Sequence, residues 1–421
     1  MDIRLTVFVA LVNHRSKHSK LMTTLVEREK SAFFATYERL PIGAVTSAEG
    51  VHINTDMGAT YLDAISGLGV NALGHSHPAI VAAIREQAGK YLHLSNLYLQ
   101  EPQIALAEKL KQASGWDKVF FCNSGTEAVE GAIKLVRKYF SDPAKTEVLG
   151  VENGFHGRTY GPLSVMDKAK YRDDFGPFVG GAACLHGYDA ATLEAAVSAR
   201  TAAVIVEPIQ GEGGIVEMPL AFIDALNALR TKFGFLIIAD EIQSGIGRTG
   251  RFFAYEHTTL VPDVVVCAKA IGGGLPLGAI LTRTEIAEKL RAGTHGTTFG
   301  GNVLACAAGC VVMDLVVGQY QSNAAIEGGY LKKGLSALQQ NYPDWIRQVR
   351  GKGLMLGVEF TAKAKDVQNH LFERQIITNV TAGEVLRLLP PLTFERKHSE
   401  ELLQGITEAV HSLAAAPSLV A

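Results

Sequence analysis

The chain has few cysteines, little excess charge and no clear membrane-spanning segment, and each shortage excludes a class of protein. Its 421 residues include only five cysteines, an odd and scattered set that does not suit a disulfide-stabilised domain. A formal net charge of −2 gives no long-range attraction to nucleic acid or to an anionic membrane. Hydrophobic residues make up 47% and charged residues 19%, a globular composition. We therefore expect a cytoplasmic protein without nucleic-acid or membrane partners.

Residues 1–21 differ from an ordinary domain start. The apolar run Leu5–Val12 is too short to span a bilayer, and it lacks the basic cluster and small-residue cleavage site of a signal peptide. Met22 opens a more ordinary beginning. We interpret residues 1–21 as an extension of uncertain role.

Metal ligands do not gather in the pattern of a known site. Cys306 and Cys310 lie four residues apart, which suits one helical face, but no second ligand pair accompanies them. His75 and His77 are equally isolated. We predict no metal site.

Apolar strands alternate with amphipathic helices through the middle of the chain. The strands are continuous apolar runs, as in a sheet that is buried on both faces. This alternation predicts an α/β fold with a mainly parallel sheet and right-handed connections. The expected strands are Val119–Cys122, Val148–Val151, Ala202–Glu207, Gly234–Ala239, Val264–Ala268 and Leu277–Leu281.

The two ends of the chain have a different pattern. Residues 51–64 contain two short alternating runs around Gly58, which predict a hairpin. Strand patterns return after the helical stretch Val303–Val317. We predict a large domain of residues 76–304 and a smaller α+β domain formed by residues 22–75 and 305–421.

Two charged residues follow neighbouring apolar strands. Asp240 closes the strand Gly234–Ala239, and Lys269 closes Val264–Ala268. The carboxyl ends of parallel strands meet at one edge of a sheet, so the two side chains are expected to face one site. Burial lowers the pKa of a lysine and frees it to attack a carbonyl group. A carboxylate opposite it suits a cofactor with a protonated ring nitrogen, such as pyridoxal phosphate.

Asn123-Ser124-Gly125-Thr126-Glu127 lies between a strand and an amphipathic helix. Free N–H groups and the helix dipole make such a turn an anion site, although Ser124 and Glu127 also form a capping box. Gly245–Gly250 matches a dinucleotide pattern, but it does not connect a strand directly to a helix. We interpret it as a loop beside the site.

Two arginines are candidate carboxylate binders. Phe155-His156-Gly157-Arg158 follows a strand, so Phe155 could stack on a planar ring and Arg158 could bind a carboxylate. Arg387 is embedded in an apolar run and needs either a ligand or a salt bridge. Glu207 and Glu212, after another strand, are natural partners for it.

These motifs, taken in order, resemble those of the class III pyridoxal-phosphate aminotransferases, the ornithine, acetylornithine and 4-aminobutyrate family. The resemblance covers about residues 30–412 and implies fold type I, pyridoxal 5′-phosphate as cofactor and a homodimer with active sites at the interface. The motifs are Ser124-Gly125-Thr126, Phe155-His156-Gly157-Arg158, Glu207-Pro208, Gly211-Glu212-Gly213, Asp240-Glu241-Ile242-Gln243, Lys269 and Thr297–Asn302.

The resemblance also implies a role for each matched residue. The cofactor would be bound covalently by Lys269, with its ring nitrogen paired to Asp240 and its ring stacked on Phe155. Substrate carboxylates would bind to Arg158 and Arg387, and Glu212 would pair with Arg387 and release it only for some substrates. The remaining implied site residues are Gly125, Thr126 and Thr298 for the phosphate (Thr298 that of the neighbouring subunit), Gln243 for the ring hydroxyl, Glu241 for the cofactor, Glu207 for catalysis and Thr297 for the substrate.

Three segments resemble the acetylornithine branch of this family. They are residues 69–75, residues 94–98 with 101–103, and Asn379–Gly383, whereas Leu99 and Val129 depart from the pattern of many acetylornithine enzymes. The implied reaction moves the terminal amino group of N2-acetylornithine to 2-oxoglutarate in arginine biosynthesis, with succinyl-diaminopimelate as a further donor. Ornithine or 4-aminobutyrate transamination is the alternative.

Other classes of protein share parts of this pattern. A racemase, mutase or decarboxylase could also use Lys269 and Asp240, but Arg387 with Glu212 favours two alternating substrates. A dinucleotide oxidoreductase would need Gly245–Gly250 to bind NAD, and a binding protein without activity would have no need for Lys269.

Overall fold

The computed structural model describes residues 24–415, so the predicted extension, residues 1–21, lies outside the described residues. The chain divides into two compact units. The described part of the smaller unit is residues 24–47 and 54–59, and it contains helix α2 (Leu25–Ala32), which Thr24 and Glu27 cap reciprocally. The larger unit begins with residues 48–53 and continues from residue 60. Strands β1 (Val45–Glu49) and β2 (His52–Thr55) lie where the chain passes between the units.

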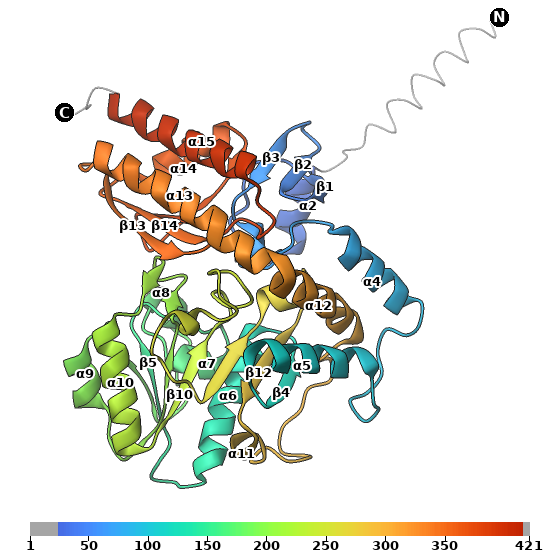
Figure 1. Ribbon diagram of the computed structural model, residues 1–421, viewed down its shortest axis with the longest axis vertical. Helices are drawn as coiled ribbons and strands as arrows, with labels where there is room; N and C mark the ends of the chain where they lie inside the picture. Colours follow the sequence, from blue (N-terminus) through green and yellow to red (C-terminus); the bar gives the residue numbers. More distant parts are fainter. Residues whose placement is uncertain (1–23, 416–421) are drawn as a thin grey trace, which may run out of the picture. The chain divides into compact units, whose positions relative to one another are not determined.

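The larger unit contains a seven-stranded sheet, which lies in the lower half of the view in Figure 1. Its order is β4-β12-β11-β10-β7-β5-β6, and only β12 runs antiparallel to its neighbours. This confirms the predicted α/β fold with a mainly parallel sheet. The strands are β4 (Lys118–Cys122), β5 (Glu147–Val151), β6 (Ala182–Leu185), β7 (Thr201–Val206), β10 (Leu236–Asp240), β11 (Val264–Cys267) and β12 (Gly278–Thr282).

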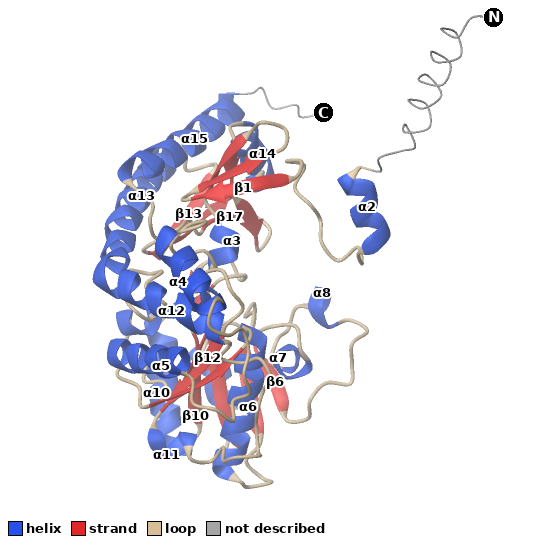
Figure 2. Ribbon diagram, turned by 90° about the vertical axis from the view of Figure 1, so that its right-hand side faces the viewer, coloured by secondary structure: helices blue, strands red, loops and turns tan. Residues whose placement is uncertain are grey.

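Helices cover both faces of this sheet, which explains why its central strands are continuous apolar runs. Helix α6 (Gly125–Phe140) packs on one face against residues such as Ile238 and Val264. Helices α5 (Glu101–Ser114) and α10 (Leu220–Phe233) lie on the other face (Figure 2). The edge strand β6 was not predicted from the sequence, because its side chains are mostly only partly buried. Shorter helices are α3 (Ser66–Gly69), α7 (Tyr160–Ser164), α8 (Ala169–Arg172), α9 (Ala190–Ala196) and α11 (Thr284–Ala287).

One long helical segment is apolar enough to resemble a membrane span. Helix α12 (Val303–Leu315) continues through the π-helix η3 (Val316–Tyr320) into α13 (Gln321–Asn341). Its apolar part packs against α5 and α4 (Pro78–Ala88), and Ala305, Cys306 and Val312 are buried there. It is a core helix of the larger unit.

A second, antiparallel sheet follows α13 and has the order β13-β14-β17-β16. Its strands are β13 (Ile346–Lys352), β14 (Met355–Phe360), β16 (Asn379–Thr381) and β17 (Val385–Leu388). Helix α13 packs on this sheet and beside α15 (Arg396–Ala415), and α14 (Ala364–Glu373) contacts β16 and β17 (Figure 2). The division into domains of 76–304 and of 22–75 with 305–421 stays a prediction.

Two further strand pairs complete the fold. The predicted hairpin at 51–64 corresponds to β2 and β3 (Thr60–Asp63), and Gly58 has the positive φ of 75° that its turn requires. Strand β3 also pairs in parallel with β15 (Ile376–Ile377). Strands β8 (Ile209–Gln210) and β9 (Val216–Glu217) form a short hairpin whose tip, residues 211–215, carries Glu212.

Candidate active site

A cavity of about 480 Å³ opens at the carboxyl ends of the parallel strands. Several wall residues come shortly after strands: Asn123 and Ser124 follow β4, Ile242 follows β10, and Lys269 follows β11. Strands β10 and β11 are neighbours, so the predicted meeting of Asp240 and Lys269 at one sheet edge is observed. Buried hydrophobic strands thus deliver polar side chains to one place. The remaining lining residues are Val70, Gly125, Thr126, Phe155, His156, Gly157, Arg158, Ala268 and Gly274–Leu277.

Lys269 occupies this cavity without a partner. Within residues 24–415 its ammonium group makes no hydrogen bond or ion pair, although Glu212 and Asp240 are close enough to influence its charge. Burial lowers the pKa of Lys269, and the nearby carboxylates only partly oppose this. The residue has a positive φ of 50°, a strained conformation for a side chain with a Cβ. A desolvated, unpaired amine of this kind is suited to attack a carbonyl carbon.

Asp240 is buried and oriented by two residues of the cavity wall. Its Oδ2 lies 2.7 Å from Nδ1 of His156, and its Oδ1 accepts a hydrogen bond of 3.0 Å from the Ile242 N–H. Burial acts to lower the pKa of His156, but the hydrogen bond and the charge of Asp240 outweigh it, so that the pKa is raised. The contact with His156 therefore stabilises the carboxylate of Asp240.

The first turn of α6 supplies hydrogen-bond donors. Ser124 is the N-cap, and its hydroxyl accepts from the Glu127 N–H at 3.3 Å. Glu127 in turn accepts from the Asn123 N–H at 2.8 Å, so the predicted capping is present. The N–H groups of Gly125 and Thr126 have no intrahelical acceptor and lie in the cavity wall. Capping and anion binding are therefore compatible at this helix terminus.

Phe155 and Arg158 line the cavity, and both contact Tyr171. The Phe155 and Tyr171 rings meet edge to face, with centroids 5.7 Å apart. The guanidinium carbon of Arg158 lies 4.1 Å from the Tyr171 ring centroid, which holds this exposed charge in a preferred position. Tyr171 was not predicted from the sequence, since nothing local links it to Arg158.

Glu207 stabilises the backbone around the cavity. Its carboxylate accepts from the Phe155 N–H at 2.8 Å and from the Gly211 N–H at 3.2 Å. Burial raises the pKa of Glu207 to about 7, although the charge of His156 opposes the shift. Glu207 thus connects the loop of Phe155 with the hairpin tip that carries Glu212. The structure gives it a positioning role.

Arg387 is buried on β17 and forms an ion pair with Glu212. Its Nε also donates to Oδ1 of Asn379 at 3.2 Å, and the same Nη1 that pairs with Glu212 donates to Oε1 of Gln243 at 3.4 Å. Burial acts to raise the pKa of Glu212, but the charge of Arg387 outweighs it and lowers the pKa. Gln243, predicted at the cofactor, therefore lies beside this pair. Of the two readings of Arg387 that the sequence left open, the salt bridge is present.

Glu241 points away from the cavity. Strand geometry sends successive side chains to opposite faces, and Asp240 takes the face toward the site. The Glu241 carboxylate accepts from the Ser244 hydroxyl at 2.6 Å and from the Tyr255 N–H at 2.8 Å. The structure therefore does not bring Glu241 into the site, and we do not assign it to the cofactor.

Thr297 and Thr298 line a second cavity of about 350 Å³, together with His93, Ser95, Asn96 and Gly296. Asn123, in the wall of the first cavity, donates to the Thr297 hydroxyl at 3.1 Å. Thr298 is exposed and does not line the first cavity. The structure thus links the two cavities through one hydrogen bond.

The arrangement as a whole is that of an enzyme with an anionic, carbonyl-bearing cofactor. Comparison with known proteins agrees, because the model of the aminotransferase class-III family matches residues 34–410. An acetylornithine aminotransferase of Aquifex aeolicus is 44% identical over 375 residues, which are 88% of this chain and 98% of that protein. One from Methanocaldococcus jannaschii is 41% identical over 387 residues, covering 91% of this chain and 97% of the relative.

Solved structures show the same fold. The ornithine aminotransferase of Toxoplasma gondii matches with a TM-score of 0.89 and 28% identity, over 95% of this chain and 98% of that one. The chain belongs to the class III aminotransferases. It is therefore an enzyme of fold type I that uses pyridoxal 5′-phosphate.

The residues of the first cavity fit this cofactor. Gly125 and Thr126 offer free N–H groups to a phosphate, and Phe155 and Ile242 supply apolar walls for a ring. Asp240 offers a buried carboxylate to a protonated ring nitrogen, and Lys269 an unpaired amine to an aldehyde. The role of His156 beside Asp240 was not predicted from the sequence, because the two residues are 84 positions apart.

Proposed function

We propose that the enzyme transfers the terminal amino group of N2-acetylornithine to 2-oxoglutarate, giving an aldehyde and glutamate. The proposal is supported by relatives named acetylornithine aminotransferases, which are 41% and 44% identical over about nine-tenths of the chain. The observation that carries it is the contrast between two arginines. Arg158 is exposed at the cavity wall, whereas Arg387 is covered by Glu212.

This contrast suits two substrates that differ in their carboxylates. N2-acetylornithine has one carboxylate, which Arg158 can bind while Glu212 keeps Arg387 neutralised. 2-Oxoglutarate has two, so that its second carboxylate displaces Glu212 from Arg387. Glu212 carries the same negative charge as the carboxylate that it replaces. It can therefore pair with Arg387 during the half-reaction with the amine donor, so that Arg387 is not left buried and unpaired.

The chemistry follows from the side chains around Lys269. When bound, pyridoxal phosphate supplies an aldehyde that takes up the amino group and a protonated ring that withdraws electrons from the breaking carbon–hydrogen bond. Asp240, held by His156, would keep the proton on that ring nitrogen. Lys269, whose pKa is lowered by burial, accepts the substrate proton and returns it as general base and acid. Gly125 and Thr126 would hold the phosphate, and Phe155 would orient the ring.

A homodimer completes the site in this proposal. Several large apolar side chains near the second cavity face solvent, with Leu97 89%, Tyr98 62%, Leu99 93% and Phe299 60% exposed. Such a patch is typical of a subunit interface. Thr298, exposed in the second cavity, would then reach the phosphate in the partner's site, and Thr297 would lie beside the substrate.

We also infer a cytoplasmic location and a role in arginine biosynthesis. The five cysteines are all free thiols, as expected of a protein in a reducing compartment. The biosynthetic role depends on N2-acetylornithine being the donor. The experiment that identifies the donor therefore also tests this role.

The test is a half-reaction screen with the holoenzyme. Excess N2-acetylornithine, ornithine, succinyl-diaminopimelate or 4-aminobutyrate is added without 2-oxoglutarate, and loss of the absorbance of the lysine-bound cofactor is followed in stopped flow. N2-acetylornithine is expected to react fastest. Arg158→Gln is expected to slow its reaction, because the donor's carboxylate loses its partner.

Faster reaction with ornithine or 4-aminobutyrate would overturn the proposed donor. If no amine reacts while the protein retains its cofactor, transamination itself is contradicted, and a racemase or mutase reaction becomes the better account.

A further inference from the structure

Arg387 belongs to a row of residues that crosses three strands of the C-terminal sheet. On β13 and β14, Arg350 is directly opposite Gly357, and on β14 and β17, Gly357 is directly opposite Arg387. Directly opposite residues in antiparallel strands project from the same face of a sheet. The two arginines therefore flank a glycine on one face, about 10 Å apart between their strands.

The hairpin tip that carries Glu212 occupies the gap over this glycine. Ile215, which is fully buried, lies so close to Gly357 that a Cβ there would be 3.0 Å from the Ile215 Cβ. Ile215 also packs in a small apolar cluster with Met355 and Leu389 of the same region. The absence of a side chain at position 357 thus lets the tip sit between the two arginines.

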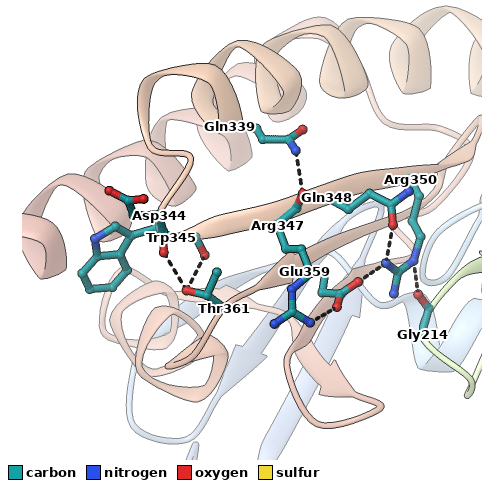
Figure 3. A network of polar contacts seen from close by, with 9 residues as sticks. All are labelled: Gly214, Gln339, Asp344, Trp345, Arg347, Gln348, Arg350, Glu359 and Thr361. Carbon is teal, nitrogen blue, oxygen red and sulfur yellow. Dashed lines mark hydrogen bonds and ion pairs between the residues drawn. The ribbon is translucent and has the colours of Figure 1, made fainter.

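Arg350 binds this tip directly. Its Nε donates to the Gly214 carbonyl at 2.8 Å, and its guanidinium also pairs with Glu359 and donates to Gln348 at 3.0 Å (Figure 3). Gly214 has a positive φ of 100° and lies against Arg350, so a side chain there would crowd the contact. The tip is thus attached to Arg350 two residues after Glu212.

Other contacts hold the tip near Glu212 itself. The Thr381 hydroxyl donates to the Glu212 carbonyl at 2.9 Å, and the Lys168 ammonium to the same carbonyl at 3.1 Å. The backbone of Glu212 is therefore fixed from β16 and from the loop before α8, and its side chain is the part that can leave Arg387. Arg350 lies in the same row of opposite residues as Arg387, and its bond to Gly214 connects the tip to that row.

We propose that Arg350 is a positioning residue for substrate choice, which by holding Gly214 keeps Glu212 in register with Arg387. The inference rests on the proposed exchange of Glu212 for a substrate carboxylate at Arg387. A dicarboxylate must displace Glu212 before it binds, so its apparent affinity includes the cost of that displacement. Loosening the tip lowers this cost and makes dicarboxylates bind more tightly, while the monocarboxylate donor gains nothing.

The chain offers a matched control in Arg347. Arg347 and Arg350 both pair with Glu359, but only Arg350 reaches Gly214 (Figure 3). Arg347→Gln and Arg350→Gln therefore remove the same kind of charge from the same carboxylate. Gly357→Ala disturbs the tip from the other side, because the added methyl group would press on Ile215.

The primary measurement is calorimetric titration of each holoenzyme with glutarate, a dicarboxylate that cannot accept an amino group. Arg350→Gln and Gly357→Ala are expected to lower the Kd for glutarate by about fivefold, the size of a modest coupling between sites. Arg347→Gln is expected to leave it unchanged. In steady state, the KM for 2-oxoglutarate should fall in the same two variants without a fall in the KM for the donor.

Unchanged or weaker glutarate binding in both Arg350→Gln and Gly357→Ala would overturn the proposal, as would an equal change in Arg347→Gln. If Arg350→Gln does not fold, Glu359→Gln replaces it, since it leaves Arg350 in place without its ion-pair partner. Glutarate binding does not depend on the amine donor. A failure of N2-acetylornithine as donor therefore refutes the proposed function and leaves this comparison valid.

Discussion

Substitution of Glu241 by glutamine is expected to change how the stability of this protein depends on pH. Glu241 is fully buried behind the site, where it accepts hydrogen bonds from Ser244 and Tyr255. Burial raises the pKa of its carboxyl group from 4.5 to about 7 in the folded chain, and the two hydrogen bonds only partly oppose this. At pH values between 4.5 and 7, Glu241 therefore holds a proton in the native state that it has released in the unfolded chain.

The sign and size of the effect follow from this difference in proton binding. Between pH 4.5 and 7 the folded state binds more protons at Glu241 than the unfolded state, so stability falls as the pH rises through this window. Above pH 7 the full cost of ionising the buried group is present, and it amounts to about 3 kcal/mol. Between pH 5.5 and 8 the expected loss is about 2 kcal/mol.

Glu241→Gln keeps a neutral side chain of the same shape and should remove this loss. Urea denaturation at pH 5.5 and pH 8, with saturating cofactor, measures for each protein how much the free energy of unfolding changes between the two pH values. We expect the pH-dependent loss of stability to be about 2 kcal/mol smaller in Glu241→Gln, with little change of stability at pH 5.5. An identical pH dependence in the two proteins would refute the reasoning about Glu241.

Three other changes test the site itself. Asp240→Asn removes the charge that His156 orients, and it should lower kcat by about 10²- to 10³-fold while the protein still binds its cofactor, as measured by absorbance and turnover. Gly125→Ala adds a methyl group 2.8 Å from Ile242, which should displace the first turn of α6 and raise the Kd for the cofactor; an unchanged Kd would argue against phosphate binding there. Leu99→Asp places a charge on the exposed apolar patch, so sedimentation should show a shift from dimer to monomer, and an undisturbed dimer would contradict an interface at this patch.

The large sheet and the site residues at the ends of its strands could be predicted from the sequence, because both depend on local patterns. Buried parallel strands are continuous apolar runs, and a charge directly after such a run stands out, as Asp240 and Lys269 do. The N-cap Ser124 was recognisable for the same reason, since capping involves residues only three apart. Strand β13 was not recognised, because four of its seven residues are Arg, Gln or Lys and only Ile346 and Gly351 are buried.

Contacts between distant parts of the chain could not be predicted in this way. His156 reaches Asp240 across 84 residues, and Arg350 reaches Gly214 across 136. Both depend on how strands and loops pack, and no periodicity records that. The orientation of Glu241 was missed for a different reason: alternation along a strand fixes opposite faces for residues 240 and 241, but the sequence does not show which face meets the cavity.

The most direct test of the central claim is to compare the unaltered enzyme with Lys269→Ala. Both are saturated with pyridoxal phosphate, and the cofactor's absorbance spectrum is recorded together with the formation of glutamate from N2-acetylornithine and 2-oxoglutarate. We predict that the unaltered enzyme shows a spectrum distinct from free cofactor and makes glutamate, whereas Lys269→Ala shows the spectrum of non-covalently bound cofactor and makes none. A Lys269→Ala protein that kept both the original spectrum and turnover would contradict the account.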